Sequence, residues 1–211
     1  MNLSKNAFYV ELARALEPEG WRKMPGPIHV SALFAKRHED LILCLGFDES
    51  DLYEDRVTAE LTLGEHASLM SFPDVPRARC RVGAHLLPDE RTRLLDDEFC
   101  RPGVTDAWWT GRTAENVMKI GEAVRLAAPR FVARPGLREE IASSERHRAY
   151  ANRLRAIAAT PHDGGKIPPD EWIEAAAALT TAPPKQRRAV AARWAADAWR
   201  VFRILGLGEP G

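Results

Sequence analysis

The sequence lacks any apolar run long enough to span a membrane. Among its 211 residues, no uninterrupted apolar stretch is longer than Leu41–Leu45, whereas a membrane helix needs about 18 apolar residues. The first residues have neither the apolar segment nor the small-residue cleavage site of a signal peptide. Cysteine is also scarce, since Cys44, Cys80 and Cys100 are too few and too far apart for a disulfide framework. We therefore expect a cytoplasmic protein in which Cys44 and Cys80 are buried free thiols.

Motifs for metal, phosphate or cofactor binding are absent too. The histidines and cysteines show none of the spacings of zinc sites. The segment Asp163-Gly-Gly-Lys166 lacks the earlier glycine and the following Ser or Thr of a phosphate-binding loop. No Gly-x-Ser-x-Gly segment marks a serine nucleophile. We predict no metal and no cofactor, but a hydrolase site assembled only in space, from residues such as His29, His85 and Asp106, stays an alternative.

The chain has no net charge, but its charges are unevenly distributed. Lys and Arg total 30, as do Asp and Glu, yet residues 1–110 carry 13 basic against 19 acidic side chains. The densest acidic segment, residues 48–55, is predicted to be a loop between two strands. Such a loop is either a solvated surface or a docking surface for a basic partner. Its candidate partner-binding residues are Asp48, Glu49, Asp51, Glu54 and Asp55.

Arginines gather on one predicted helix of the second half, namely Arg146, Arg148, Arg153 and Arg155. Glutamates share that helix, and the chain as a whole is neutral. A nucleic-acid-binding domain shows a clear basic excess. The sequence therefore disfavours nucleic acid as a partner.

The first half has the pattern of a helix followed by an antiparallel sheet. Ser4 is a suitable N-cap for a helix over residues 4–17, with apolar residues recurring every fourth position. Strands are predicted over residues 28–34, 41–47, 57–63 and 79–86. In the third strand the predicted inward side chains are Val57, Ala59, Leu61 and Leu63, and the predicted outward ones are Thr58, Glu60 and Thr62. The connections are too short for crossover helices, which favours antiparallel pairing.

The second half changes to helical periodicity. A helix of about 15–20 residues begins at Thr113 and is predicted to end or kink at Pro129. A polar helix over residues 137–157, a flexible linker near 161–169 and a short helix from Asp170 follow. The apolar stripe of the final helix consists of Val190, Trp194, Ala198, Val201 and Leu205.

These elements predict an α+β protein. Its first domain, residues 1–133, has an N-terminal helix and an antiparallel sheet of about four strands with a long helix packed on it. A helical C-terminal region, residues 137–211, follows. Trp108 and Trp109 precede the long helix, and we expect one ring in the core and one at its rim, where it either closes the core or anchors a partner.

The segments Arg79-Cys-Arg-Val-Gly83 and Asp106-Ala-Trp-Trp109, with the amphipathic helix that follows, have a recognisable spacing. Together with the first helix, the Gly20-Trp21 turn and the strands, residues 1–133 resemble a bacterial family called domain of unknown function 4304. The resemblance implies a small α+β domain and supplies no activity, cofactor or catalytic residue. Some small bacterial proteins of this kind look like immunity proteins that block a toxin.

The sequence therefore predicts a non-enzymatic protein-binding module, immunity-like or regulatory, with the spatially assembled hydrolase as the alternative. The absence of chemical motifs and the acidic segment favour the first. A cleft with converging histidine and carboxylate groups would favour the second.

Overall fold

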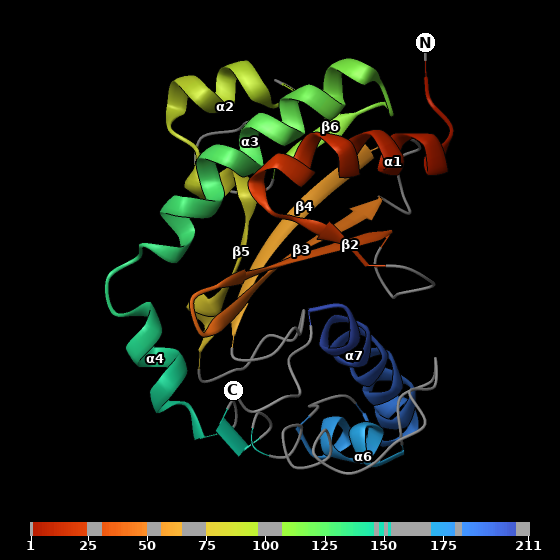
Figure 1. The fold of residues 1–211 in the computed structure, drawn as a ribbon, viewed down its shortest axis with the longest axis vertical. Coiled ribbons are helices and arrows are strands. Elements are labelled where there is room, and N and C mark those ends of the chain that lie inside the picture. Colours follow the sequence, from red (N-terminus) through yellow and green to blue (C-terminus); the bar gives the residue numbers. More distant parts are fainter. Residues whose placement is uncertain are drawn as a thin grey trace.

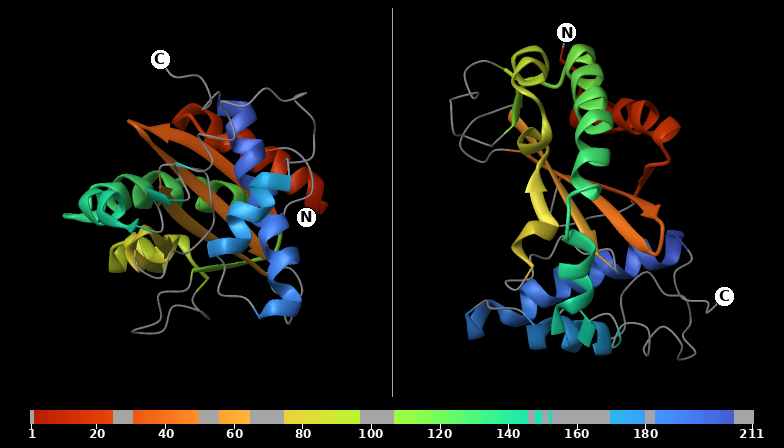
Figure 2. Two further views of the ribbon diagram at one scale, coloured as in Figure 1. Left: turned by 90° about the horizontal axis from the view of Figure 1, so that it is seen from below. Right: turned by 90° about the vertical axis from the view of Figure 1, so that its left-hand side faces the viewer.

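An antiparallel sheet lies between two groups of helices (Figures 1 and 2). The computed structural model describes residues 2–24, 31–49, 56–64, 75–96, 107–145, 148–149, 152, 170–179 and 183–205. The helices over one face are α1 (Lys5–Leu16), α2 (Pro88–Leu94) and α3 (Ala114–Val132). The helices beside the other face are α6 (Asp170–Leu179) and α7 (Pro184–Leu205). The predicted α+β class is confirmed.

The described residues form six strands, each antiparallel to its neighbours: β1 (Arg22–Lys23), β2 (Ala32–His38), β3 (Leu41–Glu49), β4 (Arg56–Gly64), β5 (Arg79–Arg81) and β6 (Trp108–Thr110). Strands β1 to β5 lie in chain order, and both β5 and β6 pair with β4, at residues 60–62 and 56–58 respectively. Strand β2 continues past its predicted end at Phe34 to His38, and residues 28–30 lie outside the described residues. The two very short strands, β1 and β6, were not predicted.

Helix α1 begins where the sequence predicts. The Ser4 hydroxyl accepts a hydrogen bond from the backbone N–H of Ala7 at 3.3 Å and so caps the helix. The buried face of the helix joins the core through Phe8, Leu12 and Leu16. After a 3₁₀ turn, Gly20 has a φ of 80°, a left-handed conformation that glycine adopts without a Cβ clash. This turn buries Trp21 and starts β1.

Both faces of the sheet are buried, which corrects one prediction. The residues of β4 that join the main core are those predicted: Val57, Ala59, Leu61 and Leu63. On the opposite face, however, Thr58 and Thr62 are only 0% and 3% exposed, and Glu60 is half-buried. The strand register is right, but α6 and α7 lie beneath this face and α7 contacts β2 (Figure 2). The prediction that Thr58 and Thr62 face solvent is therefore wrong.

The predicted strand over residues 79–86 is mostly not a strand. Strand β5 ends at Arg81, and a 3₁₀ turn over Val82–His85 leads into α2. Pro88 lies at the start of α2, where the missing N–H costs no hydrogen bond. The Glu90 carboxylate accepts the backbone N–H of Leu87 at 2.8 Å and so completes this helix start.

Helix α3 begins at the predicted residue and runs past Pro129. The Thr113 hydroxyl accepts the backbone N–H of Asn116 at 3.1 Å, and the helix then extends for 19 residues. It continues to Val132, so Pro129 does not end it; a proline in the last turn removes a single backbone hydrogen bond.

The predicted helix over residues 137–157 is interrupted: α4 (Leu137–Ser143) ends at Ser144, and the other described residues of this range, Glu145, Arg148, Ala149 and Asn152, are again helical. The predicted linker, residues 161–169, lies outside the described residues.

Helices α6 and α7 pack through two buried indoles. The rings of Trp172 and Trp199 meet edge to face, with centroids 5.2 Å apart, and each residue is 1% exposed. The buried face of α7 also contains Ala191 and Ala195. Each of these buried residues follows a residue of the predicted stripe by one position, so the buried face is rotated by about 100° around the helix. The side chain of Trp194 lies outside the described residues. None of the described helices is both long enough and apolar enough to cross a membrane.

Candidate functional site

The predicted acidic surface is only partly described. Asp48 and Glu49 end strand β3 and so are not in a loop, which corrects the sequence prediction. The other three residues of the set, Asp51, Glu54 and Asp55, lie outside the described residues. Asp48 is half-buried and contributes to raising the pKa of the Arg79 guanidinium, a smaller effect than the hydrogen bond that Arg79 donates to Glu60.

Glu49 is engaged in contacts within the chain. Its carboxylate accepts hydrogen bonds from Lys5 Nζ at 3.0 Å and from Tyr9 Oη at 3.2 Å, and Arg112 Nη1 lies 3.5 Å away. Burial and the neighbouring Glu49 raise the pKa of Tyr9, so the phenol stays protonated and donates. Glu49 thus ties α1 to β3, and its binding to a partner stays a prediction.

The two tryptophans of β6 point to opposite faces, as adjacent strand residues do. Trp109 is 0% exposed, and its indole N–H donates to the carbonyl of Leu94 at 2.7 Å. Trp108 is half-buried and lies opposite Thr58 in the register. The expectation that one ring enters the core is met by Trp109, and the binding of a partner at this pair stays a prediction.

His85 is the one residue of the predicted hydrolase set that the structure describes. Its ring lies 5.5 Å from that of Phe131, and its Nε2 has no hydrogen-bond partner in the described part of the chain. Burial, Arg134 and Arg130 all lower the pKa of His85. A histidine base is normally oriented by a carboxylate, whereas the charges acting on His85 are cationic. The other two residues of the predicted set, His29 and Asp106, lie outside the described residues.

The thiol of Cys80 is not activated either. Burial raises its pKa to about 12, so it stays protonated near neutral pH and is a poor nucleophile. Among the described residues, no three His, Cys, Asp or Glu side chains gather in a way that could hold a metal ion.

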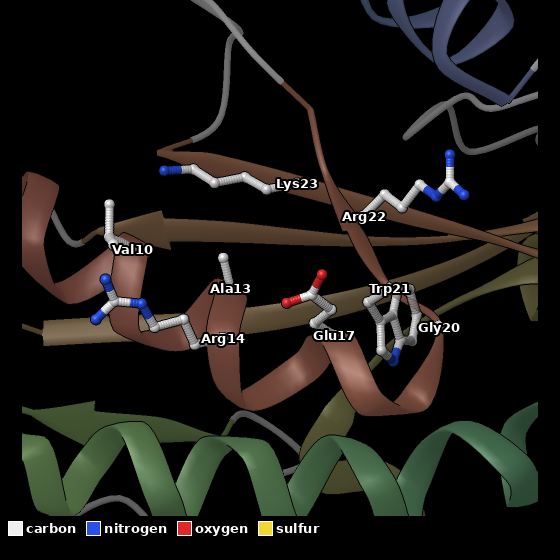
Figure 3. A pocket seen from close by; sticks show the side chains of 8 residues that line it. All are labelled: Val10, Ala13, Arg14, Glu17, Gly20, Trp21, Arg22 and Lys23. Carbon is white, nitrogen blue, oxygen red and sulfur yellow. The ribbon is translucent and has the colours of Figure 1, made fainter.

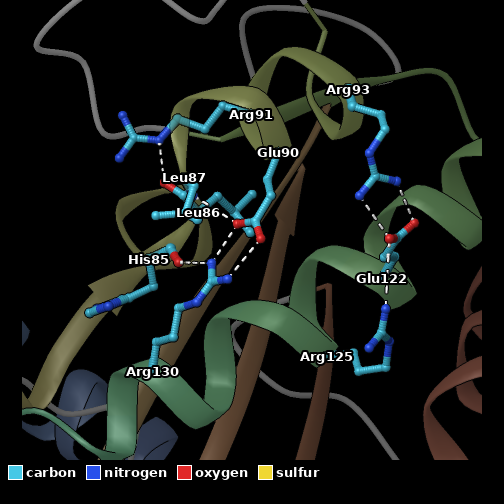
Figure 4. Close-up of polar contacts among 9 residues, drawn as sticks. All are labelled: His85, Leu86, Leu87, Glu90, Arg91, Arg93, Glu122, Arg125 and Arg130. Atoms are coloured by element: carbon cyan, nitrogen blue, oxygen red, sulfur yellow. Dashed lines mark hydrogen bonds and ion pairs between the residues drawn. The ribbon is translucent and has the colours of Figure 1, made fainter.

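A second polar cluster joins α2 to α3 (Figure 4). Arg130 donates to both oxygens of Glu90, with the Nη2–Oε1 pair at 2.7 Å, and also to the carbonyl of His85 at 3.0 Å. These hydrogen bonds lower the pKa of Glu90 to about 2. A parallel pair of 2.8 Å hydrogen bonds joins Arg93 to Glu122. Because the carboxylates and guanidinium groups already pair with one another, this cluster fits a structural role better than a ligand site.

A groove of about 660 Å³ lies between α1 and β1 (Figure 3). The apolar part of its lining consists of Val10, Ala13 and Trp21. The charged part of its lining consists of Arg14, Glu17, Arg22 and Lys23. Figure 3 shows α1 along one side and β1 along the other, with Trp21 at the turn that joins them. We call this hollow the α1–β1 groove.

A second hollow of about 430 Å³ shares Gly20 and Arg22 with the α1–β1 groove. It adds further basic groups, Lys36, Arg37 and His38, and one carboxylate, Glu19. Lys36 Nζ lies 4.7 Å from the centre of the Trp21 ring and donates to the carbonyl of Glu19 at 3.0 Å. The linings of the two hollows together contain more cationic than anionic side chains.

The backbone of β1 contributes to the same groove. The backbone N–H of Met24 donates to the carbonyl of Leu33 at 2.8 Å, which makes these two residues a hydrogen-bonded pair. Such pairs alternate along antiparallel strands, and Lys23 lies opposite Phe34 at the next position. The N–H and C=O of Lys23 therefore point away from β2, toward an edge of the sheet that no other described strand covers.

Sequence analysis did not identify the α1–β1 groove. A strand of two residues has no periodicity to recognise. The cations of the groove and of the second hollow come from α1, β1 and β2, in a half of the chain with net negative charge. The one local indication of the groove in the sequence is Gly20-Trp21-Arg22-Lys23, a turn residue and a tryptophan followed by two cations.

No family model, curated protein or solved structure matches the chain. The resemblance to the domain of unknown function 4304 family therefore stays a prediction, and the α1–β1 groove is the candidate site on geometric grounds.

Proposed function

We propose that the protein is a non-enzymatic binding module that holds a protein partner in the α1–β1 groove. The observation that carries the proposal is the combination of an apolar floor, a charged rim and an open strand edge in one hollow. Interfaces between proteins have the same plan, an apolar centre within a polar rim. The α2–α3 cluster offers no comparable surface because its charges are paired internally.

A binding role is supported by the exposed cationic side chains of the groove, Arg14, Arg22 and Lys23, which can orient a partner of opposite charge. We propose an immunity-like or regulatory role in the cytoplasm, with a protein and not nucleic acid as the partner. The free thiols of Cys44 and Cys80 support this location, because disulfides form mainly in oxidising compartments.

Selection from a random peptide library displayed on phage tests the proposal. Clones enriched on the wild-type protein should lose binding to Ala13→Trp, whose indole fills the α1–β1 groove. The matched control is Ala142→Trp, the same substitution at an exposed alanine of α4, and it should bind like the wild type.

Ala13 packs against the core, so its replacement could also disturb the fold. The double charge reversal Arg14→Glu/Lys23→Glu asks the same question at exposed positions, and thermal unfolding checks both variants. If no clone is enriched, or if the enriched clones bind all these variants equally, the α1–β1 groove is not the binding surface.

A further inference from the structure

We infer that the partner segment held in the α1–β1 groove is an extended acidic peptide, which adds to β1 as a further strand of the sheet. This inference rests on the proposed function and specifies the chemistry of the partner. It combines the open edge of β1, the helix that runs along it and the excess of positive charge on the rim.

The open edge supplies backbone pairing. Strand β1 pairs only with β2 among the described strands, and Lys23 directs its N–H and C=O away from β2. Exposed sheet edges are templates for another strand, and main-chain hydrogen bonds of this kind provide affinity in many peptide-binding domains. A strand laid beside β1 would lie in the groove between β1 and α1 (Figure 3).

The floor of the groove accepts apolar side chains at alternate positions. An extended strand directs successive side chains to opposite faces. The side chains on the α1 side would meet Val10 and Ala13, which line the groove beside the buried Trp21. A peptide with a small or β-branched apolar residue at every second position fits this floor.

The rim selects acidic side chains. The two joined hollows contain five cationic side chains, Arg14, Arg22, Lys23, Lys36 and Arg37, against the carboxylates Glu17 and Glu19. Charge complementarity of this kind speeds association and rejects partners of the wrong sign. Arg14 already pairs with Glu11 at 2.5 Å, so it adds less to the attraction than Arg22 and Lys23.

The test uses a fluorescent hexapeptide of alternating glutamate and valine, titrated into the full-length protein and followed by fluorescence anisotropy. We expect saturable binding that weakens as salt is added. The same peptide with lysine in place of glutamate should not bind. If both peptides bind equally, or if neither binds, the inference is wrong.

Methylation of the peptide nitrogens tests strand pairing itself. Alternate residues of a strand direct their N–H groups to opposite edges. Methylation at one set of alternate positions should therefore abolish binding, while methylation at the other set leaves it. Equal effects of the two methylated peptides would show that the peptide does not bind as a strand.

Variants of the protein separate charge from backbone. Lys23→Pro removes the outward N–H, and it should abolish binding. Arg22→Gln/Lys23→Gln keeps the backbone, and it should weaken binding by about tenfold at low salt because each exposed ion pair contributes a few-fold. Arg125→Gln removes an exposed charge from α3 and should leave binding unchanged. Equal binding by all of these variants would overturn the inference.

The outcomes for the inference and for the proposed function are distinguishable. Library clones that need the groove but are neutral or helical would support the proposed function and refute the acidic strand. Concentration-dependent dimers of the wild type that Lys23→Pro abolishes would show that β1 pairs with a second copy, and the inference would again be wrong.

Discussion

Replacing Trp199 with alanine should detach the C-terminal helices from the rest of the fold. The ring is almost fully buried against Trp172, and truncation of a core aromatic residue costs about 3–5 kcal/mol. About 0.5–1.5 kcal/mol of this reflects the edge-to-face contact, which Trp199→Phe retains in part. We therefore expect the free energy of unfolding, measured with urea, to decrease from the wild type to Trp199→Phe and further to Trp199→Ala.

The reactivity of Cys44 gives an independent readout of the same perturbation. Cys44 lies in β3 on the face that α6 and α7 approach, and it is buried. In a Cys80→Ser/Cys100→Ser background its thiol should react slowly with a disulfide reagent, and Trp199→Ala should accelerate the reaction. The control is Met118→Ala, since Met118 is 69% exposed and surface substitutions change stability by about 0.5 kcal/mol or less. A cost below about 1 kcal/mol for Trp199→Ala, with unchanged Cys44 reactivity, would refute a shared core.

Three further predictions concern individual groups. Glu90→Gln removes a carboxylate whose pKa the Arg130 hydrogen bond lowers from 4.5 to about 2. A lowered carboxyl pKa stabilises the fold at pH values above the pKa of the unfolded state. The free energy of unfolding in urea should therefore be higher for the wild type than for the variant above pH 4.5, and the difference should fade as the pH approaches 2. Trp109→Phe leaves the Leu94 carbonyl without its indole donor and should cost about 1–3 kcal/mol in urea unfolding; no measurable cost would contradict that hydrogen bond. Because burial lowers the pKa of His85 from 6.5, stability should decline as pH falls below 6.5, and a decline of the same size in His85→Phe would rule His85 out as its source.

The elements that sequence analysis identified are those with local signals. Helices α1 and α3 begin at the side-chain caps of Ser4 and Thr113, and each has an apolar face that repeats with the helical period. Strand β3 has a continuous apolar run, and β4 has regular alternation of apolar and polar residues. Their antiparallel pairing follows from the short connection between them.

The elements that it missed depend on tertiary contacts. Strands β1 and β6 have two and three residues, and they exist because β2 and β4 offer backbone partners. The burial of Thr58 and Thr62 also has no local signal, since it depends on tertiary contacts, such as those of Thr58 with Arg81 and β6. Propensity and alternation describe one strand at a time, whereas coverage of its second face is a property of the whole fold.

The candidate site was missed for a related reason. Counts of charge along the chain drew attention to residues 48–55, but Glu49 is paired internally with Lys5. The cations of the α1–β1 groove and of the second hollow extend from Arg14 to Arg37, and the turn at Gly20 and the pairing of β1 with β2 bring them together.

Hydrogen exchange at the Lys23 backbone amide is the most direct test of the α1–β1 groove as a strand-adding site. This N–H points away from β2, so it should exchange rapidly in the free protein and more slowly as the glutamate–valine hexapeptide saturates the groove. Exchange at amides of α3, on the opposite side of α1 from the groove in Figure 3, should not change. Slower exchange elsewhere with no change at Lys23 would contradict the account.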